Sequence, residues 1–524
     1  MKKKLIAFAL ITVLILSTQG QIAYADINRN DMRAVWIATI LNLDYPSVKN
    51  DERAQKKEFI TMLNKLQAVG INTVMVQVRP KADAFYKSSI NPWSESLTGT
   101  QGKDPGYDPM AFMIAETHKR GMSFHAWLNP YRVTNNTTDI NTLSANHPAR
   151  QHPEWLIECN GALYYNPELS GVKQHVVDTV KEIVQNYDVD GIHFDDYFYP
   201  SNYPLPEGET KDGAVANARR DNVNEMVKLV NNTIKSIKPD VLFGISPMGI
   251  WKNSTSDSTG SNTKGSEAYY SVYSDCRAWV KAGTIDYIVP QIYWEIGYKI
   301  ADYETLVKWW SNEVKNSSVT LYIGQAAYRE TVARQMDQQL LINQKYSNVK
   351  GSVYFRATDI IANREGVGDK LKAFYSLKKV TALASAHKVI INGQVQPFDA
   401  YNINGSNYFK LRDIAARLSG SQAQFNVTWD PIFEAINLEK MSPYIIVGGE
   451  LVTGNNASRQ ATMTTATLML DRELTFAAAY NINGNNYYKL RDLGRLIGFA
   501  VGWNPVTETV SIDSSRNYTD RVSK

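Results

Sequence analysis

Eight short apolar runs alternate with amphipathic stretches between Met32 and about Tyr375. Each run has the length of a β-strand, and the stretches between the runs repeat their apolar residues with the period of an α-helix. Eight strands that alternate with helices are the pattern of a (β/α)₈ TIM barrel, so the sequence predicts that α/β fold. The runs are Arg33–Thr39, Asn72–Arg79, Ser123–Asn129, Asp190–Asp196, Leu242–Pro247, Asp286–Trp294, Leu321–Ala326 and Ser352–Arg356.

An open, doubly wound sheet is the alternative interpretation of this alternation. Such a sheet usually carries a Gly-rich phosphate-binding turn after its first strand, and none follows Thr39. The barrel is therefore preferred. The predicted helices are Arg53–Val69, Pro109–Arg120, Val172–Asn186, Arg219–Ile237, Tyr270–Ala282, Tyr303–Lys315 and Glu330–Tyr346.

The predicted strands carry polar residues on one side and aliphatic residues on the other. In the fourth run, for example, His193 and Asp195 bracket Phe194. Alternate residues of a barrel strand point inward, and a purely structural barrel would fill these positions with Val, Ile and Leu. Polar inward positions near the strand ends therefore predict an active site there. The others are Gln77, Arg79, His125, Trp127, Asn129, Gln291, Tyr293, Glu295, Tyr354 and Arg356.

The fourth run ends in two adjacent carboxylates, Asp195 and Asp196. Neighbouring carboxylates are costly unless they are paired or used, although a helix cap with a salt bridge is a structural alternative. Glycoside cleavage needs a second carboxyl group across the scissile bond, and Glu295, just past the sixth run, is the predicted partner. We predict Asp195 and Glu295 as the working pair and Asp196 as the third catalytic residue.

Further polar and aromatic side chains near the strand ends are predicted to bind substrate. Arg79 can hold a carboxylate bidentately and, with Asp196, is predicted to tune the catalytic pair. No metal or other cofactor is predicted. The predicted substrate-binding residues are Arg79, His125, Trp127, Asn129, Arg132, His193, Tyr197, Gln291, Tyr293, Trp294 and Arg356.

Net charge and aromatic content indicate which class of molecule the protein binds. A net charge of +4 over 524 residues argues against a nucleic-acid partner, which requires a concentrated basic face. The 30 Tyr and 11 Trp residues instead suit a cleft in which aromatic rings stack on sugars. Cys159 and Cys276 have no His or Cys neighbours at metal-ligand spacing, and their pairing stays open.

The first 25 residues have the pattern of an export signal. Lys2 to Lys4 form a positive region, Leu5 to Leu16 form an apolar core too short for a comfortable membrane span, and Ala23-Tyr24-Ala25 is a small-x-small cleavage site. We predict a signal peptide over residues 1–25, no transmembrane anchor after cleavage, and a secreted or cell-wall-associated bacterial protein. An uncleaved anchor is the alternative.

A chain of 524 residues is too long for one hydrophobic core. We predict a barrel domain over residues 29–378, a linker over residues 379–388, and a small duplicated β-rich α+β module over residues 389–513.

The duplication is visible as residues 400–414, which recur as residues 479–493. Each copy contains Asn-Gly, which predicts a hairpin turn, and then Lys-Leu-Arg-Asp, which predicts the start of a short helix. A strand signal that contains a tryptophan, Trp429 or Trp503, follows each copy.

Five segments of the barrel region carry a family resemblance. They are Met32-Arg-Ala-Val-Trp-Ile-Ala38, Val76-Gln-Val-Arg-Pro80, Pro92-Trp-Ser-Glu95, His125-Ala-Trp-Leu-Asn-Pro-Tyr-Arg132 and Asp190-Gly-Ile-His-Phe-Asp-Asp-Tyr197. These segments resemble the family-10-like glycosyl hydrolases, bacterial exported enzymes once described only as a domain of unknown function. The resemblance covers about residues 29–375 and implies a TIM barrel that hydrolyses peptidoglycan glycan strands stripped of stem peptides.

The resemblance also implies an acidic motif on the fourth strand, matched by Asp195 and Asp196. The motif resembles the chitinase strand motif too, but Tyr197 stands where that motif has its acid.

The tandem repeat resembles the copper amine oxidase N-terminal-like stalk modules of secreted bacterial proteins, over about Lys388–Asp513. It implies no copper, because no His-rich ligand set accompanies it, and it suggests contact with the cell wall.

The sequence thus predicts an exported glycoside hydrolase acting on a cell-wall polysaccharide. A non-catalytic glycan-binding or wall-structural protein is one alternative, because barrels host many functions. A metal-dependent deacetylase or amidase, with His125, His193 and Asp195 as metal ligands, is another.

Overall fold

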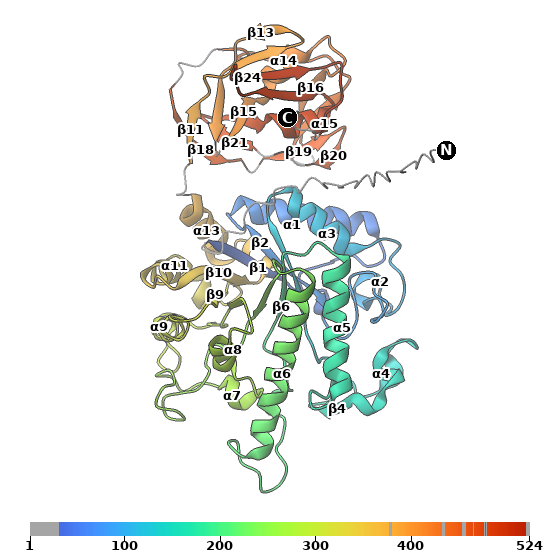
Figure 1. The fold of residues 1–524 in the computed structure, drawn as a ribbon, viewed down its shortest axis with the longest axis vertical. Coiled ribbons are helices and arrows are strands. Elements are labelled where there is room, and N and C mark those ends of the chain that lie inside the picture. The colour runs from blue at the N-terminus through green and yellow to red at the C-terminus, as the bar shows by residue number, and fades with distance from the viewer. Residues whose placement is uncertain are drawn as a thin grey trace, which may run out of the picture.

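The computed structural model describes residues 31–376, 380–403, 405–431, 435–452, 457–464, 466–475, 477 and 479–519. The predicted signal peptide therefore lies outside the described residues. Figure 1 shows a helix-covered barrel and a β-rich part formed by the chain from Val380 onward. No helix within the described ranges is long and apolar enough to cross a membrane.

Eight parallel strands close into a barrel in the order β1-β10-β9-β8-β7-β6-β3-β2, which confirms the predicted fold. Each of the eight predicted runs contains or overlaps one strand. The bounds are β1 Met32–Ile37, β2 Thr73–Arg79, β3 Ser123–Leu128, β6 Gly191–Phe194, β7 Leu242–Ile245, β8 Tyr287–Ile288, β9 Thr320–Ala326 and β10 Val349–Phe355.

Helices surround the barrel, and several begin where an aspartate side chain accepts a backbone N–H. Asp51 caps α1, Asp108 caps α3 and Asp302 caps α9. The helices between and after the strands are α1 Glu52–Ala68, α2 Glu95–Thr98, α3 Pro109–Lys119, α4 Pro148–Gln151, α5 Ser170–Asn186, α6 Ala214–Ile237, α7 Ala268–Ser271, α8 Cys276–Ala282, α9 Tyr303–Glu313, α10 Glu330–Arg334, α11 Met336–Lys345, α12 Ala357–Ile361 and α13 Val367–Ser376.

Two predicted helices are each divided in the structure. The segment 270–282 becomes α7 and α8, because Tyr273 has a positive φ of 53° and Asp275 caps a new helix. The segment 330–346 becomes α10 and α11. A hairpin of β4 (Leu156–Cys159) and β5 (Ala162–Tyr165) also follows β3. Cys159 and Cys276 are both free thiols.

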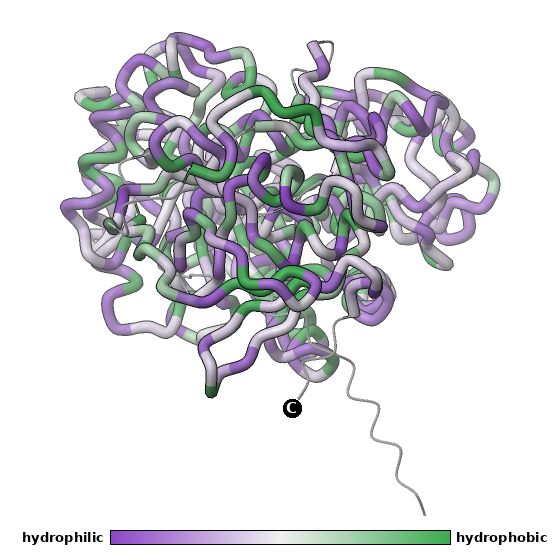
Figure 2. The backbone as a smooth tube through the Cα atoms, turned by 90° about the horizontal axis from the view of Figure 1, so that it is seen from above, coloured by the Kyte–Doolittle hydropathy of each residue, from purple (hydrophilic) through white to green (hydrophobic). Residues whose placement is uncertain are grey.

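The barrel has two apolar layers. Val35 and Val76 belong to the large cluster between the strands and the surrounding helices. Trp36, Met75 and Tyr287 belong to a smaller cluster inside the barrel. Hydrophobic and hydrophilic stretches accordingly alternate along the chain (Figure 2). The interior is filled with side chains and is a packed core, as barrels of this size require.

The second part contains a closed six-stranded barrel, β11-β14-β15-β22-β21-β18, and two four-stranded sheets, β13-β12-β24-β23 and β16-β17-β19-β20. Both predicted hairpin-and-helix copies are present. The first copy has β12 Lys388–Ile391, β13 Gln394–Gln396, β14 Ala400–Ile403, β15 Ser406–Lys410, α14 Leu411–Leu418, β16 Phe425–Asp430 and β17 Ala435–Lys440. The second has β19 Thr467–Leu470, β20 Glu473–Thr475, β21 Ala479–Ile482, β22 Asn485–Lys489, α15 Leu490–Ile497, β23 Ala500–Asn504 and β24 Thr509–Asp513.

The predicted linker over residues 379–388 is wrong for half of its length. Strand β11 (Val380–Ala384) pairs with β14 and with β18 (Arg459–Met463). Ala382 is fully buried whereas Leu383 is exposed, so the segment has the alternation of a strand with one buried face. Small residues hid this alternation in the sequence.

The two copies are interlocked. Strand β12 of the first copy pairs in parallel with β24 of the second, and β19 of the second pairs in parallel with β17 of the first. A third contact, β15 with β22, joins the two hairpins. Each copy therefore supplies strands that complete the sheets of the other.

We predict that this module folds only as a pair of copies. A chain ending at Lys440 leaves β11, β12, β15 and β17 each with one open edge, where the pairing with the second half of the module is lost. It should aggregate or dimerise by exchange of strands, because open strand edges recruit other chains. A chain ending at Ser376 should remain monomeric and keep the melting transition of the barrel. Size-exclusion chromatography and thermal unfolding measure both, and a monomeric, protease-resistant chain ending at Lys440 contradicts the interlock.

Candidate active site

The adjacent carboxylates Asp195 and Asp196 directly follow β6, at the end of the barrel where the strands terminate. Asp195 is only 4% exposed. Its Oδ2 accepts hydrogen bonds from Asn129 Nδ2 and from Trp127 Nε1 at 3.2 Å, and its Oδ1 accepts the backbone N–H of Tyr197 at 3.2 Å. Asp196 is half-buried.

Asp196 Oδ1 accepts a hydrogen bond from Gln291 Nε2 at 3.0 Å, and the same amide nitrogen donates to the carbonyl of Ser246 at 2.9 Å. The structure thus brings together around the two carboxylates five residues predicted from the sequence. They are Trp127, Asn129, Arg132, Tyr197 and Gln291.

The electrostatics of the two carboxylates are coupled. Burial, and next the charge of Asp196, raise the pKa of Asp195 to about 7. Burial also raises the pKa of Asp196, while the Arg132 guanidinium opposes the rise for both groups. Two such carboxyls titrate as a unit and can hold one proton between them near neutral pH. Glycoside cleavage uses this state, in which one carboxyl is protonated and another is ionised.

Asn129 is oriented by a second amide, that of Gln77. Gln77 Oε1 accepts the backbone N–H groups of Thr39 and Ile40, both at 3.0 Å, so its Nε2 faces Asn129 Oδ1 at 2.5 Å. Asn129 must then direct its own N–H toward Asp195. Gln77 was identified as inward-facing from the sequence but not as part of the site, because the sequence does not show which side chains share a hydrogen bond.

Arg79, predicted to tune the carboxylates, directs its guanidinium to other partners. Its Nη1 donates to the carbonyl oxygens of Asn129 at 2.6 Å and Pro130 at 3.2 Å, and its Nη2 lies 3.4 Å from His175 Nε2. The β2–β3 pairing shifts its register between Gln77 and Arg79, which removes Arg79 from the alternation. Arg132 carries the predicted charge effect instead.

His125 and His193 also differ from the prediction, because they lie inside the barrel, where both contact Tyr287. His193 Nε2 accepts from Trp36 Nε1 at 3.0 Å, and His193 Nδ1 and His125 Nδ1 lie 3.1 and 2.8 Å from the Tyr287 hydroxyl. Burial lowers the pKa of His125 to about 4 and lowers the pKa of His193 well below its usual range. The two rings thus fill the core as neutral groups and do not join Asp195 in a ligand set.

Arg356 was predicted to bind substrate, but its guanidinium already has protein partners. It donates to the carbonyl of Leu43 at 2.9 Å and pairs with Asp359 at 3.3 Å and Asp44 at 3.8 Å. The inward prediction for β10 was off by one residue. Phe355 packs against the inner cluster and Tyr354 belongs to the outer one, and the β10–β9 pairing contains a register shift between Val349 and Ser352.

Glu295 follows β8 in the chain. Its Oε2 accepts a hydrogen bond at 3.2 Å from the Oγ1 of Thr331, a residue of α10. The charges that shift the pKa of Asp195 include Asp196, which raises it, and Arg132, which opposes the rise; both belong to segments other than that of Glu295. The role of Glu295 as the partner acid stays a prediction. Trp294 is half-buried and packs against the outer core, and its carbonyl accepts from Gln339 at 3.1 Å.

Aromatic rings surround the carboxylates. Tyr197, 42% exposed, lies under the Arg132 guanidinium at 4.2 Å. Burial, and then the charge of Asp196, raise the pKa of Tyr293 well above its usual range. Tyr293 stacks on Phe355 at 6.1 Å, and Tyr328, 41% exposed, meets Phe355 edge-on at 5.7 Å. Tyr328 and Phe355 were missed, although each lies at or just past a predicted strand end.

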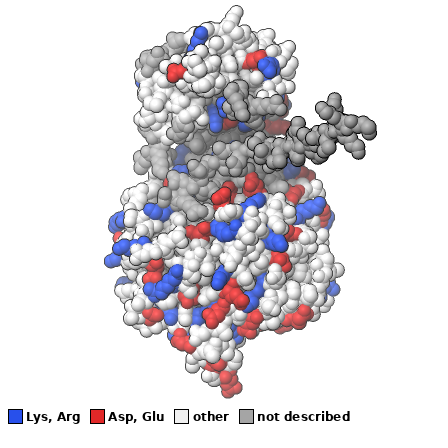
Figure 3. All heavy atoms as spheres, viewed as in Figure 1, with Lys and Arg blue, Asp and Glu red and all other residues white. Residues whose placement is uncertain are grey.

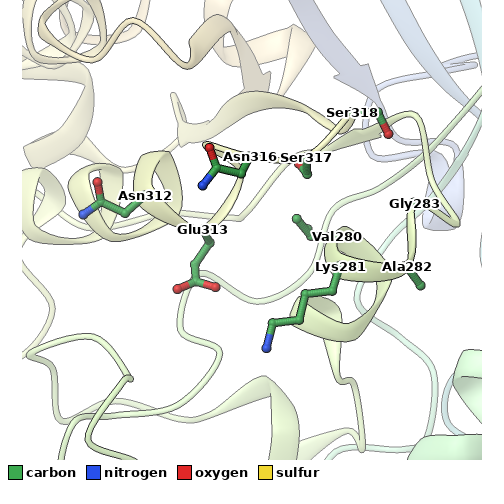
Figure 4. Close-up of a pocket in the computed structure, with 9 residues that line it drawn as sticks. All are labelled: Val280, Lys281, Ala282, Gly283, Asn312, Glu313, Asn316, Ser317 and Ser318. Atoms are coloured by element: carbon green, nitrogen blue, oxygen red, sulfur yellow. The ribbon is translucent and has the colours of Figure 1, made fainter.

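A surface hollow elsewhere in the barrel domain, shown in Figure 4, does not belong to this site. Its lining residues, among them Glu313 and Gly283, precede β8 and β9 and therefore lie where strands begin, at the end opposite the aspartates. Glu313 there forms an ion pair with Arg277.

Comparison with known proteins gives a family match and two relatives of high identity. The family described as "Glycosyl hydrolase-like 10" matches residues 31–342. "Glycosyl hydrolase YngK" from Bacillus subtilis (strain 168) is 49% identical over 365 residues, covering 65% of this chain and 71% of that protein. "Glycosyl hydrolase DigH" from Escherichia coli (strain K12) is 41% identical over 336 residues, covering 60% of this chain and 76% of that protein.

Among solved structures, the PgaB (BpsB) glycoside hydrolase domain from Bordetella bronchiseptica is 11% identical, with a TM-score of 0.44, and the match covers 67% of this chain and 99% of that one. This likeness is too distant to support a conclusion.

We predict that Arg132 sets the pH dependence of the site. In Arg132→Gln the opposing positive charge is lost, so the pKa of both aspartates should rise, and the limb of the kcat/KM profile that the pair controls should move up by about one pH unit. The direction is the same whether that limb reports an acid or a base. Arg356→Gln, which removes a charge paired elsewhere, should leave the limb in place. A downward shift in Arg132→Gln contradicts the assignment.

Proposed function

The chain belongs to the glycosyl hydrolase-like 10 family and is a glycoside hydrolase, and from this premise we propose that it cleaves a bacterial cell-wall polysaccharide, the glycan strands of peptidoglycan. The observation that carries the chemistry is the adjacent pair of buried Asp195 and half-buried Asp196, both of whose pKa values are raised. The choice of polymer rests on the family resemblance of the barrel motifs and on the export signal.

We propose that Asp195 is the ionised carboxylate of the reaction. Two N–H donors, from Asn129 and Trp127, point at its Oδ2, so that oxygen acts as an acceptor and does not carry a proton. It can attack the anomeric carbon or activate a water. Glu295 is proposed as the acid that protonates the leaving oxygen. Asp196 is proposed as the neighbouring carboxyl that titrates together with Asp195.

The rim suits a sugar chain. Tyr197, which follows the two carboxylates in the chain, is 42% exposed, and Tyr328, whose ring contacts Tyr293 and Phe355, is 41% exposed. Aromatic rings stack on the apolar faces of pyranose rings, and the wall formed by Tyr293 and Phe355 extends that surface toward Asp196. These rings support a polysaccharide substrate over a small polar one.

Export is proposed from residues 1–25 alone. If the signal is cleaved as proposed, protein isolated from the culture medium or the wall fraction begins at or near Asp26 when its N-terminus is sequenced. A chain that keeps Met1 in the cytosolic fraction contradicts export.

The experiment that tests the function is digestion of purified glycan strands, with and without stem peptides, followed by mass analysis of the products. The wild-type chain should release oligosaccharides from the peptide-free strands. Asp195→Asn and Glu295→Gln, which are nearly isosteric, should lose several orders of magnitude in turnover while melting close to wild type.

The outcomes separate the roles. If Asp195→Asn works within about tenfold of wild type, a loss of only ~1.4 kcal/mol of transition-state stabilisation, then Asp195 is not the ionised catalyst. If Asp196→Asn is inactive and Glu295→Gln is active, the acid is Asp196. If no strand is cut by the wild-type chain, peptidoglycan glycan is not the substrate.

A further inference from the structure

The C-terminal module exposes one tryptophan at the same position of each copy. Trp429 on β16 is 60% exposed and Trp503 on β23 is 37% exposed. A single exposed apolar side chain is ordinary on a protein surface, but indole is the largest side chain and both copies keep it. The repeated placement points to a function for the ring.

The exposure follows from where each strand leaves the core. Along β16, Phe425 is fully buried, Val427 is half-buried and Trp429 is exposed, although all three share one face of the strand. On β23, Val501 packs against the module core and Trp503 lies two residues beyond it. Each indole is therefore fixed to a paired strand at its base while its ring extends past the core.

The ring of Trp503 has polar neighbours that suit a sugar. His387 lies 4.6 Å from it between ring centroids, and His387 Nδ1 lies 3.2 Å from Asn407 Nδ2. In the view of Figure 3 the module shows few charged side chains, whereas the barrel carries many of both signs. An aromatic ring with hydrogen-bonding groups beside it matches the chemistry of a polysaccharide chain.

We propose that Trp429 and Trp503 are two stacking platforms for a polysaccharide, and that together they hold the enzyme on insoluble wall material. This inference rests on the proposed function for the identity of the polymer, but retention is measured separately from cleavage. The two platforms lie on the edge strands of two different sheets of one interlocked module, so insoluble wall material that contacts both of them is held by two linked sites.

The test is depletion of the full chain from solution by insoluble peptidoglycan, on ice and for short times so that cleavage is negligible. Trp429→Ala and Trp503→Ala should each weaken retention at least tenfold, and the double variant should fall to background, because one of two linked sites contributes through avidity. Trp429→Tyr should keep most of the retention, since it keeps an aromatic face. Ile446→Ala is the matched control, because that residue is 76% exposed in the same module and apolar but not aromatic.

Turnover of soluble glycan strands should be unchanged in all of these variants. Retention that survives in the double variant, or that falls equally in Ile446→Ala, overturns the proposal. So does a loss of self-association in the double variant with no loss of retention, since the rings would then serve contact between copies of the chain. If strands are not cleaved but retention depends on both tryptophans, the proposed function fails and the binding site stands.

Discussion

The desolvated carboxyl of Asp195 is the group on which the arrangement of this site depends. A carboxylate that is 4% exposed and adjacent to another is unfavourable unless donors surround it. Asn129, Trp127 and the backbone of Tyr197 supply those donors. The amide of Asn129 is in turn fixed by Gln77, whose own orientation is set by two backbone N–H groups after β1. The ends of four strands, β1, β2, β3 and β6, are therefore connected by hydrogen bonds that lead to one carboxyl group.

A second group of hydrogen-bonded polar side chains lies inside the barrel, beneath the site. His125, His193 and Tyr287 form a chain of hydrogen bonds within the barrel, at 2.8 and 3.1 Å. Two glycines make room for it. A Cβ on Gly191 would lie 2.6 Å from His125 Nδ1, and one on Gly244 would lie 2.1 Å from the ring of Tyr287. A buried polar network of this kind is stable when its members are bonded to each other, and it fixes which strands can be neighbours.

The alternation of residues along each strand predicted many of the side chains that face the inside of the barrel, and its failures have identifiable reasons. It correctly gave inward positions to Trp127, Asn129 and Asp195, because β3 and β6 pair without interruption. It failed for Arg79, where a bulge in the β2–β3 pairing shifts the register. It also failed for Tyr354, because Val353 and Phe355 face the inside of the barrel and the polar character of Tyr354 indicated the wrong face of β10. A bulge depends on tertiary pairing and leaves no mark in a single sequence. The strand β11 was missed for another reason, since Ala382 is too small to show the alternation.

The point at which the chain leaves the barrel domain agrees with separate roles for the barrel and the C-terminal module. Helix α13 ends beside the first strand, where the Tyr375 ring lies 5.3 Å from the Arg33 guanidinium. Arg33 is the second residue of β1, so the chain leaves the barrel domain at the end where strands begin. Asp195 and Asp196 lie where β6 finishes, at the opposite end. The segment that leads to the module is therefore remote from the loops that form the catalytic rim. Duplication within the module requires no change in the geometry of the carboxylates.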